Sequence, residues 1–227
     1  MSDSIEAYSN LSRAEALDGS AITHPELRRM HEAMLDYLVV FPVKHLMYDG
    51  RIGQGQLVAH EAMQSVFEDI FEGMLDLGYP IEHVVPGVEY GWNDELMMDD
   101  NATGCYRPEQ IGDLDDEWYL SEHFRGSGFD LNSLDNPEVT STNQVRPARA
   151  FGRVPYAPAL LSERPKVIEL FDEHDMEYGG AWKTPGHKDY YAGPQIPIDR
   201  HHFELRPRQI GRLAVPAGWW PEMPSRG

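Results

Sequence analysis

The segment Ser121-Glu-His123-Phe-Arg-Gly126-Ser-Gly128-Phe-Asp130 predicts a sharp reversal of the chain around which the fold is built. His123 and Asp130 stand seven positions apart, and they can meet if His123 ends a loop and Asp130 returns on a strand. Gly126 and Gly128 allow that reversal, because glycine tolerates backbone angles that are closed to other residues. Taken alone, the pair also fits a solvated loop histidine and an ordinary surface aspartate.

A second segment, Asp199-Arg-His-His202-Phe-Glu204, offers further imidazoles near the C-terminus. If it forms a strand, alternation sends His202 and Glu204 to one face and His201 to the other. Only one of the two histidines can then point easily into a given pocket. Taken alone, this segment is ambiguous, and a surface histidine pair is its alternative.

The two segments together contain the ligands of a zinc site. His123, Asp130 and His202 would supply two nitrogens and one oxygen, and they would leave one coordination position open for water. Asp199, three residues before His202, would be a nearby proton acceptor. Three protein ligands, an open position and an acceptor are the components of a zinc hydrolase.

Size and composition favour one globular domain. The chain has 227 residues, of which 41% are hydrophobic and 11% aromatic, enough to bury a sizeable core. Its 19 basic and 38 acidic residues leave a formal charge of -19. Such a surface repels nucleic-acid phosphates and anionic membranes, so we expect neither as the main partner. Cys105 is the only cysteine, which excludes an intramolecular disulfide and a cysteine-based metal site.

The sequence also bears on where the protein acts. The N-terminal residues 1–6 show no basic region followed by an apolar run, so we expect no secretory signal. No window of about 18 apolar residues exists to span a bilayer. We therefore expect synthesis in the cytoplasm without a signal peptide, and any action outside would need release by another component.

The pattern of elements predicts a single α+β domain, with a flexible N-terminal arm at 1–22, the main domain at 23–210 and a C-terminal tail at 211–227. The expected helices are 23–35 with Thr23 as N-cap, 61–77, and 162–178 with Ser162 as N-cap. The expected strands are 37–41 ending at Pro42, 56–60, 129–132, a segment beginning at Ala181-Trp182, and 202–205. The expected connections are turns at Asp49-Gly50 and Gly53-Gln-Gly55 and loops over 94–100, 133–158 and 183–197.

These motifs resemble the zinc peptidases of the D-alanyl-D-alanine carboxypeptidase (VanY-like) family, and within it the L-alanyl-D-glutamate endopeptidases of phage endolysins. The family's first motif, Ser-x-His-x-x-Gly-x-Ala-x-Asp, is met at 121–130, with Gly128 where alanine is usual. Its second motif is met at 199–204. The Gly-Gly-x-Trp that commonly precedes the second motif is present as Gly179, Gly180 and Trp182.

The resemblance runs in order from about Gly55 to Leu205. Its upstream parts are Gly55-Gln-Leu-Val-Ala-His60, the helix ending in Gly78-Tyr-Pro-Ile81, and an Asn-x-Thr-x-x-x-Arg segment, here Asn101, Thr103 and Arg107. The departures are the glycine at position 128, the extended 133–158 loop and the insertion between Trp182 and Asp199. These departures concern substrate selectivity more than the metal site.

The resemblance implies the family's fold, a small antiparallel sheet with flanking helices as in the hedgehog and D-alanyl-D-alanine peptidase-like proteins. It also implies Zn2+ on His123, Asp130 and His202, with Asp199 as the base that takes a proton from water. Arg107 would stabilise the oxyanion, although a surface salt bridge is its alternative. The residues assigned to substrate binding are Trp182, for which a core position is the alternative, Ser121, which could instead orient a ligand, Asn101 and Thr103.

The implied reaction is hydrolysis of the stem peptide of bacterial peptidoglycan at the L-alanyl-D-glutamate bond, by an enzyme that reaches the cell wall after release. A D-alanyl-D-alanine carboxypeptidase or dipeptidase on the same scaffold is the second interpretation. A catalytically inactive, zinc-containing wall-binding module is the third. Asp199 and Arg107 favour the enzymes, since a mere binder needs neither.

Overall fold

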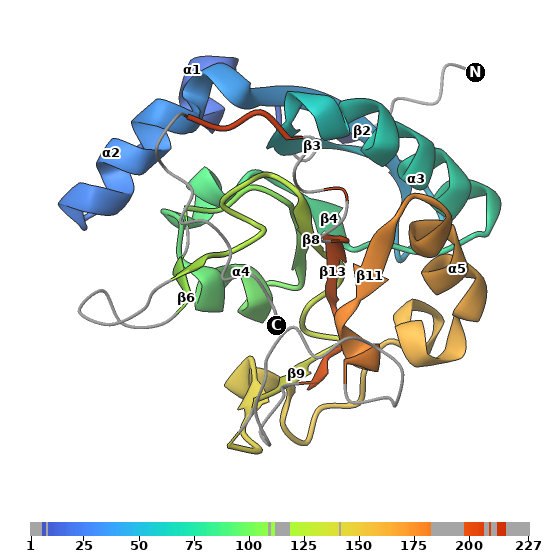
Figure 1. Cartoon of the computed structure of the whole chain (residues 1–227). Helices are drawn as coiled ribbons and strands as arrows, with labels where there is room; N and C mark the ends of the chain where they lie inside the picture. The colour runs from blue at the N-terminus through green and yellow to red at the C-terminus, as the bar shows by residue number, and fades with distance from the viewer. Residues whose placement is uncertain are drawn as a thin grey trace.

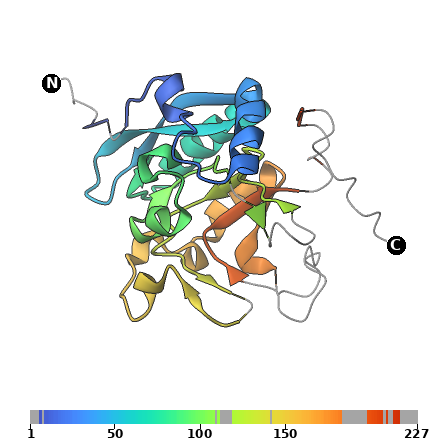
Figure 2. The ribbon, with the colours of Figure 1, turned by 90° about the vertical axis from the view of Figure 1, so that its left-hand side faces the viewer.

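The structure is a computed structural model that describes residues 6–7, 9–108, 110–111, 119–140, 142–182, 198–206, 209 and 213–216 (Figure 1). Helices and small β-sheets occur together along these residues, so the predicted α+β class is confirmed. In the turned view of Figure 2, the blue N-terminal segments lie on one side of the molecule and the orange and red C-terminal strands on the other. Within the described residues, no helix has both the length and the apolar character needed to cross a membrane.

A long β-hairpin backed by a helix forms the first part of the core. β2 (Leu38–Leu46) pairs with β3 (Ile52–His60) along its whole length, and β1 (Glu6–Ala7) joins β3 in parallel. α3 (Gln64–Asp76) follows a 3-10 helix at Glu61–Met63 and packs against β2, within the predicted 61–77 span (Figure 1). Its buried residues recur at helical spacing: Phe67, Ile70, Phe71 and Met74. Burial of each such side chain stabilises the fold by about 1.5–3 kcal/mol.

Two expectations for this hairpin are wrong, whereas its turn at Asp49-Gly50 is as predicted. β2 continues through Pro42, which is exposed on the edge strand of its sheet, where a residue without an N–H group is tolerated. The predicted turn at Gly53-Gln-Gly55 lies inside β3. A Cβ atom on Gly55 would lie 2.3 Å from the carbonyl oxygen of Val84, so this glycine permits a close approach of two backbones.

A second antiparallel sheet carries two of the candidate ligands. β13 (His202–Leu205) lies between β8 (Gly128–Asp130) and β11 (Met176–Tyr178), which confirms the closing strand at 202–205. The predicted helix over 162–178 is shorter. It forms α5 (Pro165–Glu173), and β11 takes the place of its last turn because Tyr178, Glu177 and Met176 pair with β13.

The register of this sheet separates an apolar face from a polar one. Phe129 stands opposite Phe203, and both are completely buried in the main core. The Phe203 ring stacks on Phe171 with centroids 3.7 Å apart. Because successive side chains on a strand alternate, Asp130 and its partner His202 face the other side. Core packing therefore forces the two candidate ligands onto one face.

The 133–158 segment, which the sequence predicts as an irregular loop, contains a hairpin. β9 (Glu138–Val139) pairs with β10 (Val145–Arg146) on one side and with β12 (Ile198–Asp199) on the other. The buried carboxylate of Asp135 anchors the segment, and four groups donate to it: Arg153 Nη1 at 2.7 Å, Tyr48 Oη at 2.5 Å, Asn101 Nδ2 at 2.9 Å and the Tyr156 amide at 2.9 Å. A buried charge needs such partners, so the hairpin has a defined position.

Shorter elements connect these sheets. They are α1 (Arg13–Ala16), α2 (Pro25–Met34), β4 (His83–Val84), α4 (Asp94–Asp99), β5 (Ala102–Thr103), β6 (Gln110–Ile111) and β7 (Tyr119–Leu120). Further 3-10 helices are Leu35–Tyr37, Gly87–Tyr90, Ala148–Ala150, Ala157–Ala159, Leu161–Glu163 and Gly179–Ala181.

Three of the predicted helix and loop assignments differ from the structure, and side-chain capping explains two of them. His24, not Thr23, caps α2, and its Nδ1 accepts a hydrogen bond from the Leu27 amide. Asn93 caps α4 in the same way, so a helix forms where the sequence predicts the 94–100 loop. Arg164, not Ser162, precedes α5, which starts at a proline. Ala181 and Trp182, where a strand was predicted to begin, are not in a strand, because Gly179–Ala181 form a 3-10 turn.

The described part of the expected N-terminal arm, residues 9–22, packs against the body. Its buried residues are Ala16, Leu17 and Ile22, which join a second hydrophobic cluster with Met30 and Phe124. In the tail, Leu213 is buried and the Ala214 carbonyl accepts a hydrogen bond from His60 Nε2 at 2.7 Å. Residues 1–5, the predicted 183–197 loop and Trp219-Trp220 lie outside the described residues.

His45, buried in β2, makes the stability of the fold depend on pH. Burial lowers the pKa of His45 from 6.5 to about 4, and nearby His83 adds to the effect. The folded state therefore favours the neutral ring: its contribution is present above about pH 6.5 and is lost as pH falls towards about 4. We expect this loss to be roughly 3 kcal/mol of unfolding free energy.

Urea denaturation of the metal-free protein at about pH 7.5 and about pH 4.5 measures this loss, with a His45→Leu variant as the comparison. The variant should lose less unfolding free energy between the two pH values than the wild type. An equal loss in both proteins would contradict the assignment.

Candidate metal centre

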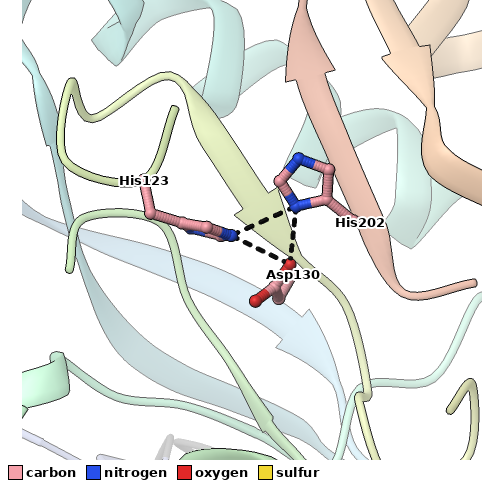
Figure 3. Close-up of side chains that lie close together, drawn as sticks. All are labelled: His123, Asp130 and His202. Atoms are coloured by element: carbon pink, nitrogen blue, oxygen red, sulfur yellow. Dashed lines mark hydrogen bonds and ion pairs between the residues drawn. The ribbon is translucent and has the colours of Figure 1, made fainter. Parts of the chain in front are cut away.

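His123, Asp130 and His202, here called the ligand triad, point toward one another in the interior (Figure 3). His123 Nε2 lies 3.1 Å from Asp130 Oδ1 and 3.1 Å from His202 Nδ1, and His202 Nδ1 lies 3.0 Å from Asp130 Oδ1. His123 comes from the loop before β8, Asp130 from β8 and His202 from β13. The sequence prediction that these three side chains meet is therefore confirmed, and the group could bind a metal ion.

The spacing of the three atoms suits a tetrahedral cation. Zinc–nitrogen and zinc–oxygen bonds of about 2.0–2.1 Å in tetrahedral geometry place neighbouring ligand atoms about 3.3 Å apart. The three distances of the ligand triad, 3.0–3.1 Å, are close to one face of such a tetrahedron. Among the residues that the structure describes, these three form the candidate group, and a tetrahedral ion held by them would have a fourth position for another ligand.

The hydrogen bonds on the far side of each imidazole set its tautomer. His123 Nδ1 lies 2.6 Å from the Cys105 carbonyl oxygen, which can only accept, so the proton is on Nδ1. His202 Nε2 lies 3.3 Å from Glu204 Oε2, which favours a proton on that nitrogen. The nitrogens that face each other then both present lone pairs, an arrangement that a shared cation stabilises.

Without a metal ion, protons can take the place of the shared cation. Burial alone would raise the pKa of Asp130, but the charges of His123 and His201 outweigh it and hold the pKa well below its usual range. Burial opposes protonation of His202, yet hydrogen bonds with Asp130 and Glu204 raise its pKa well above the usual value. The centre thus attracts positive charge, and a metal ion would compete there with a proton.

The loop that carries His123 is held by its own backbone. The Glu122 carbonyl accepts hydrogen bonds from the amides of Ser127 and Gly128 at 3.0 and 2.9 Å. Ser121 Oγ accepts one from the His123 amide at 3.2 Å, so Ser121 orients a ligand, one of the two roles considered for it. Gly126 adopts a φ of +68°, and a Cβ there would lie 2.3 Å from the His60 amide. The predicted glycine reversal is confirmed.

Gly128, which replaces the alanine usual in the resembled family, has no room for a side chain. A Cβ would lie 2.7 Å from the His123 nitrogen and 3.0 Å from the Glu122 carbonyl carbon, both backbone atoms. We expect Gly128→Ala to lower the unfolding free energy by about 1–3 kcal/mol. It should also weaken metal binding, because the backbone of a ligand must move. Urea denaturation and zinc competition titration measure the two effects.

Gly50→Ala is the matched control for this prediction. Gly50 has a φ of +83°, and a Cβ added there would meet nothing within 4 Å, so alanine introduces backbone strain without a clash. It should cost about 1 kcal/mol of stability and leave metal affinity unchanged. Wild-type metal affinity in Gly128→Ala would contradict the argument.

Arg107 contacts the ligand triad directly. Its Nη1 lies 3.3 Å from Asp130 Oδ2 and 3.0 Å from Asp94 Oδ1, and the residue is buried. The salt bridge considered as the alternative is therefore present, but it is buried and not at the surface. The guanidinium lies beside the carboxylate oxygen that the triad leaves unused, where it can donate to a further ligand of the centre.

Asp199, the predicted proton acceptor, stands at the edge of the same region. Its Oδ1 lies 3.1 Å from His201 Nε2, and His201 Nδ1 lies 2.9 Å from the Asn136 carbonyl oxygen. Burial opposes protonation of His201, but Asp199 and Asp130 raise its pKa above the ordinary value. Gly179 packs under Asp199: a Cβ on Gly179 would lie 2.7 Å from the Asp199 carbonyl oxygen.

The choice between the adjacent histidines is resolved by the strand boundary. β13 begins at His202, so His201 is outside the strand and does not follow its alternation. His201 Nε2 still lies 3.9 Å from Asp130 Oδ1, near the ligand triad but bonded elsewhere. His202, as predicted, belongs to the group that could bind a metal ion. The contact of His201 with Asp199 was not predicted.

The remaining predicted site residues have mixed positions. The Trp182 ring lies 5.5 Å from the His202 ring and is buried, so it covers a ligand. Asn101 Oδ1 accepts hydrogen bonds from the Leu134 and Asp135 amides, and Thr103 Oγ1 accepts one from the Asn132 amide. These contacts support the chain that follows β8. A substrate role for Asn101 and Thr103 stays a prediction, and these hydrogen bonds to the backbone do not favour it.

The structure adds contacts around the ligand triad. Glu204, which strand alternation already placed on the face of His202, lies 3.3 Å from His202 Nε2. Asp94, Glu138 and Arg146 belong to distant segments and carry no local signal.

Comparison with known proteins gives no independent family assignment. No family model matches the chain, and comparisons with curated proteins and with solved structures find no match either. The function must therefore be argued from the motifs and from the geometry of the ligand triad.

Proposed function

We propose that the protein is a zinc-dependent peptidase that hydrolyses the stem peptide of bacterial peptidoglycan, at the L-alanyl-D-glutamate bond. The observation that carries the proposal is the ligand triad, three buried donor atoms 3.0–3.1 Å apart that match one face of a tetrahedron. Arg107 contacts Asp130 directly, and Asp199 is linked to the triad through His201. The substrate class is inferred from the resemblance of the ordered motifs between Gly55 and Leu205 to those of the peptidoglycan zinc peptidases.

The donor set fits zinc. Two imidazole nitrogens and one carboxylate oxygen are a common ligand set of catalytic zinc sites, whose fourth position is kept for water or substrate. When bound, zinc acts as a Lewis acid and makes a hydroxide nucleophile available near neutral pH. The same donors also suit ferrous iron, so metal analysis belongs to the test.

The chain's own residues provide the remaining chemistry. Asp199 accepts the proton of the attacking water and passes it to the leaving amine. Arg107, held at the centre by Asp94 and Asp130, donates to the carbonyl oxygen as negative charge develops on it. Trp182 covers His202 and limits the access of bulk water on that side.

A D-alanyl-D-alanine carboxypeptidase or dipeptidase could use the same arrangement, and a zinc-containing wall-binding module would need the ligand triad alone. The burial of Arg107 against Asp130 favours an enzyme, because a binding module gains nothing from a guanidinium at the metal ligand. Action on the wall after release from the cytoplasm belongs to the same proposal.

The test combines metal analysis with digestion of purified peptidoglycan, before and after chelation. We expect about one zinc ion per chain and a chelator-sensitive loss of turbidity, restored by zinc. Mass spectrometry of the products should show new L-alanine carboxyl termini and D-glutamate amino termini. Release of free D-alanine would identify the carboxypeptidase instead. Zinc binding without any hydrolysis would identify the binding module.

A further inference from the structure

The small sheet that holds Asp199 places three charged residues in one row. In the register of β10, β9 and β12, Arg146 stands opposite Glu138, and Glu138 stands opposite Asp199. Residues paired across antiparallel strands share a face of the sheet. Arg146, Glu138 and Asp199 therefore form a continuous row, here called the charge ladder, with Asp199 at the end near the ligand triad.

Arg146 bonds a different carboxylate with each of its three nitrogens. Nη1 lies 3.2 Å from Glu138 Oε2, Nη2 lies 2.9 Å from Asp94 Oδ2, and Nε lies 2.8 Å from Glu95 Oε1. A planar guanidinium holds such partners in fixed directions, which a lysine could not do. Arg146 thus joins β9, β10 and α4 at one point.

Two of these carboxylates lead to the proposed catalytic groups. Asp94 uses its other oxygen to bind Arg107 at 3.0 Å, and Arg107 reaches Asp130 of the ligand triad. Glu138 lies next to Asp199 on the charge ladder. Burial raises the pKa of Glu138, Asp199 raises it further, and Arg146 lowers it. The half-exposed Arg146 is therefore the cation that keeps these crowded carboxylates together.

We infer that Arg146 is a positioning residue for the proposed reaction: through Asp94 it holds Arg107, and by pairing with Glu138 it offsets the repulsion between the neighbouring carboxylates of Glu138 and Asp199. The inference rests on the proposed function, since it concerns the groups that would move a proton and stabilise an oxyanion. It assigns a role to the hairpin at 138–146, which belongs to the segment where the chain departs from the resembled family.

The simpler explanation, that Arg146 only fastens the hairpin to α4, has an internal control. Arg149 also joins this segment to α4, because its Nη1 donates to the Asp99 carbonyl at 2.7 Å. That contact involves no carboxylate of the charge ladder. Arg149→Gln should therefore show the effect of losing a contact between the hairpin segment and α4, without any change at the charge ladder.

The experiment compares Arg146→Gln and Arg149→Gln as zinc-loaded full-length proteins on a purified stem peptide. For Arg146→Gln we expect kcat to fall by about 10–100-fold, with KM within about threefold and zinc content unchanged. Arg149→Gln should keep wild-type kcat. A fall of similar size in both variants would overturn the inference.

The pH profile separates a charge effect from a packing effect. The groups facing the charge ladder are Asp94 and Glu95 of α4, His201 before β13 and Tyr178 of β11. Removal of the Arg146 cation makes the neighbouring carboxylates harder to ionise, so the acidic limb of kcat/KM should move to higher pH. The double variant Arg146→Gln, Glu138→Gln also lacks one uncompensated negative charge. Its acidic limb of kcat/KM should therefore move back towards the wild-type pH. An unmoved limb would overturn the inference.

A structural readout keeps the inference separate from the proposed function. In a crystal structure of Arg146→Gln, we expect Asp199 to leave its contact with His201 and Arg107 to leave Asp130. If both contacts persist, Arg146 does not position these groups, whatever the activity. If the wild type hydrolyses no stem peptide while the contacts break as expected, the proposed function fails and the positioning role stands.

Discussion

His202→Ala is expected to abolish metal-dependent hydrolysis and to release the metal from the purified protein. His202 Nδ1 lies 3.0 Å from Asp130 Oδ1 and 3.1 Å from His123 Nε2, so its loss removes one of three donors and leaves a buried gap. Loss of a group that merely supports a ligand costs about 10–100-fold in metal affinity or activity. We therefore expect metal affinity to fall by more than about 100-fold. Zinc competition titration and peptidoglycan turbidity measure the two losses.

Two other histidines control for this variant. His174 is half-buried just after α5, and His174→Ala should keep both metal and activity. His201 is adjacent to the ligand but bonds Asp199 and the Asn136 carbonyl, so His201→Ala should keep the metal while reducing kcat. If His202→Ala retained zinc and His201→Ala lost it, the ligand assignment would be reversed.

Asp199→Asn is expected to give a protein that binds zinc normally but turns over about 10²–10⁴-fold more slowly. An amide has nearly the shape of a carboxylate, yet it cannot take a proton from water. Asp199 is not a member of the ligand triad, so its substitution should leave the metal affinity unchanged. Metal analysis together with kcat on a stem peptide tests both halves of this prediction.

Asp172→Asn provides the matched control, since Asp172 is an exposed carboxylate of α5 that pairs with Arg206 and makes no contact with the ligand triad. It should keep full activity. Wild-type kcat in Asp199→Asn would remove Asp199 from the mechanism. Loss of zinc from that variant would instead make Asp199 a structural support of the site.

The ligand triad could be predicted because each part has a local cause. The reversal at Gly126 requires a positive φ, and Gly128 admits no side chain, so the two nearby glycines indicated the turn. Alternation placed Asp130 and His202 opposite the buried Phe129 and Phe203. Local backbone chemistry and burial therefore carried most of the information about these three residues.

Other features depended on neighbours that no local pattern identifies. From the sequence, Gly55 is predicted to be a turn residue. In the structure it allows a close backbone approach, since a Cβ there would lie 2.3 Å from the Val84 carbonyl oxygen. Pro42 is predicted to end a strand, but β2 continues through it because β2 is the edge strand of its sheet. Glu138 and Arg146 look like surface residues of a loop, and their place beside Asp199 follows from the pairing of β9 with β12.

The sequence alone determined the class of fold, the main helices, and the residues able to hold a metal, because helix periodicity, strand alternation and glycine turns act over a few residues. Only the tertiary structure decided that Asp94, Glu138 and Arg146 join Arg107 and Asp199 in one charged network. Those residues come from segments far apart along the chain, and which segments meet is set by how apolar faces are buried together.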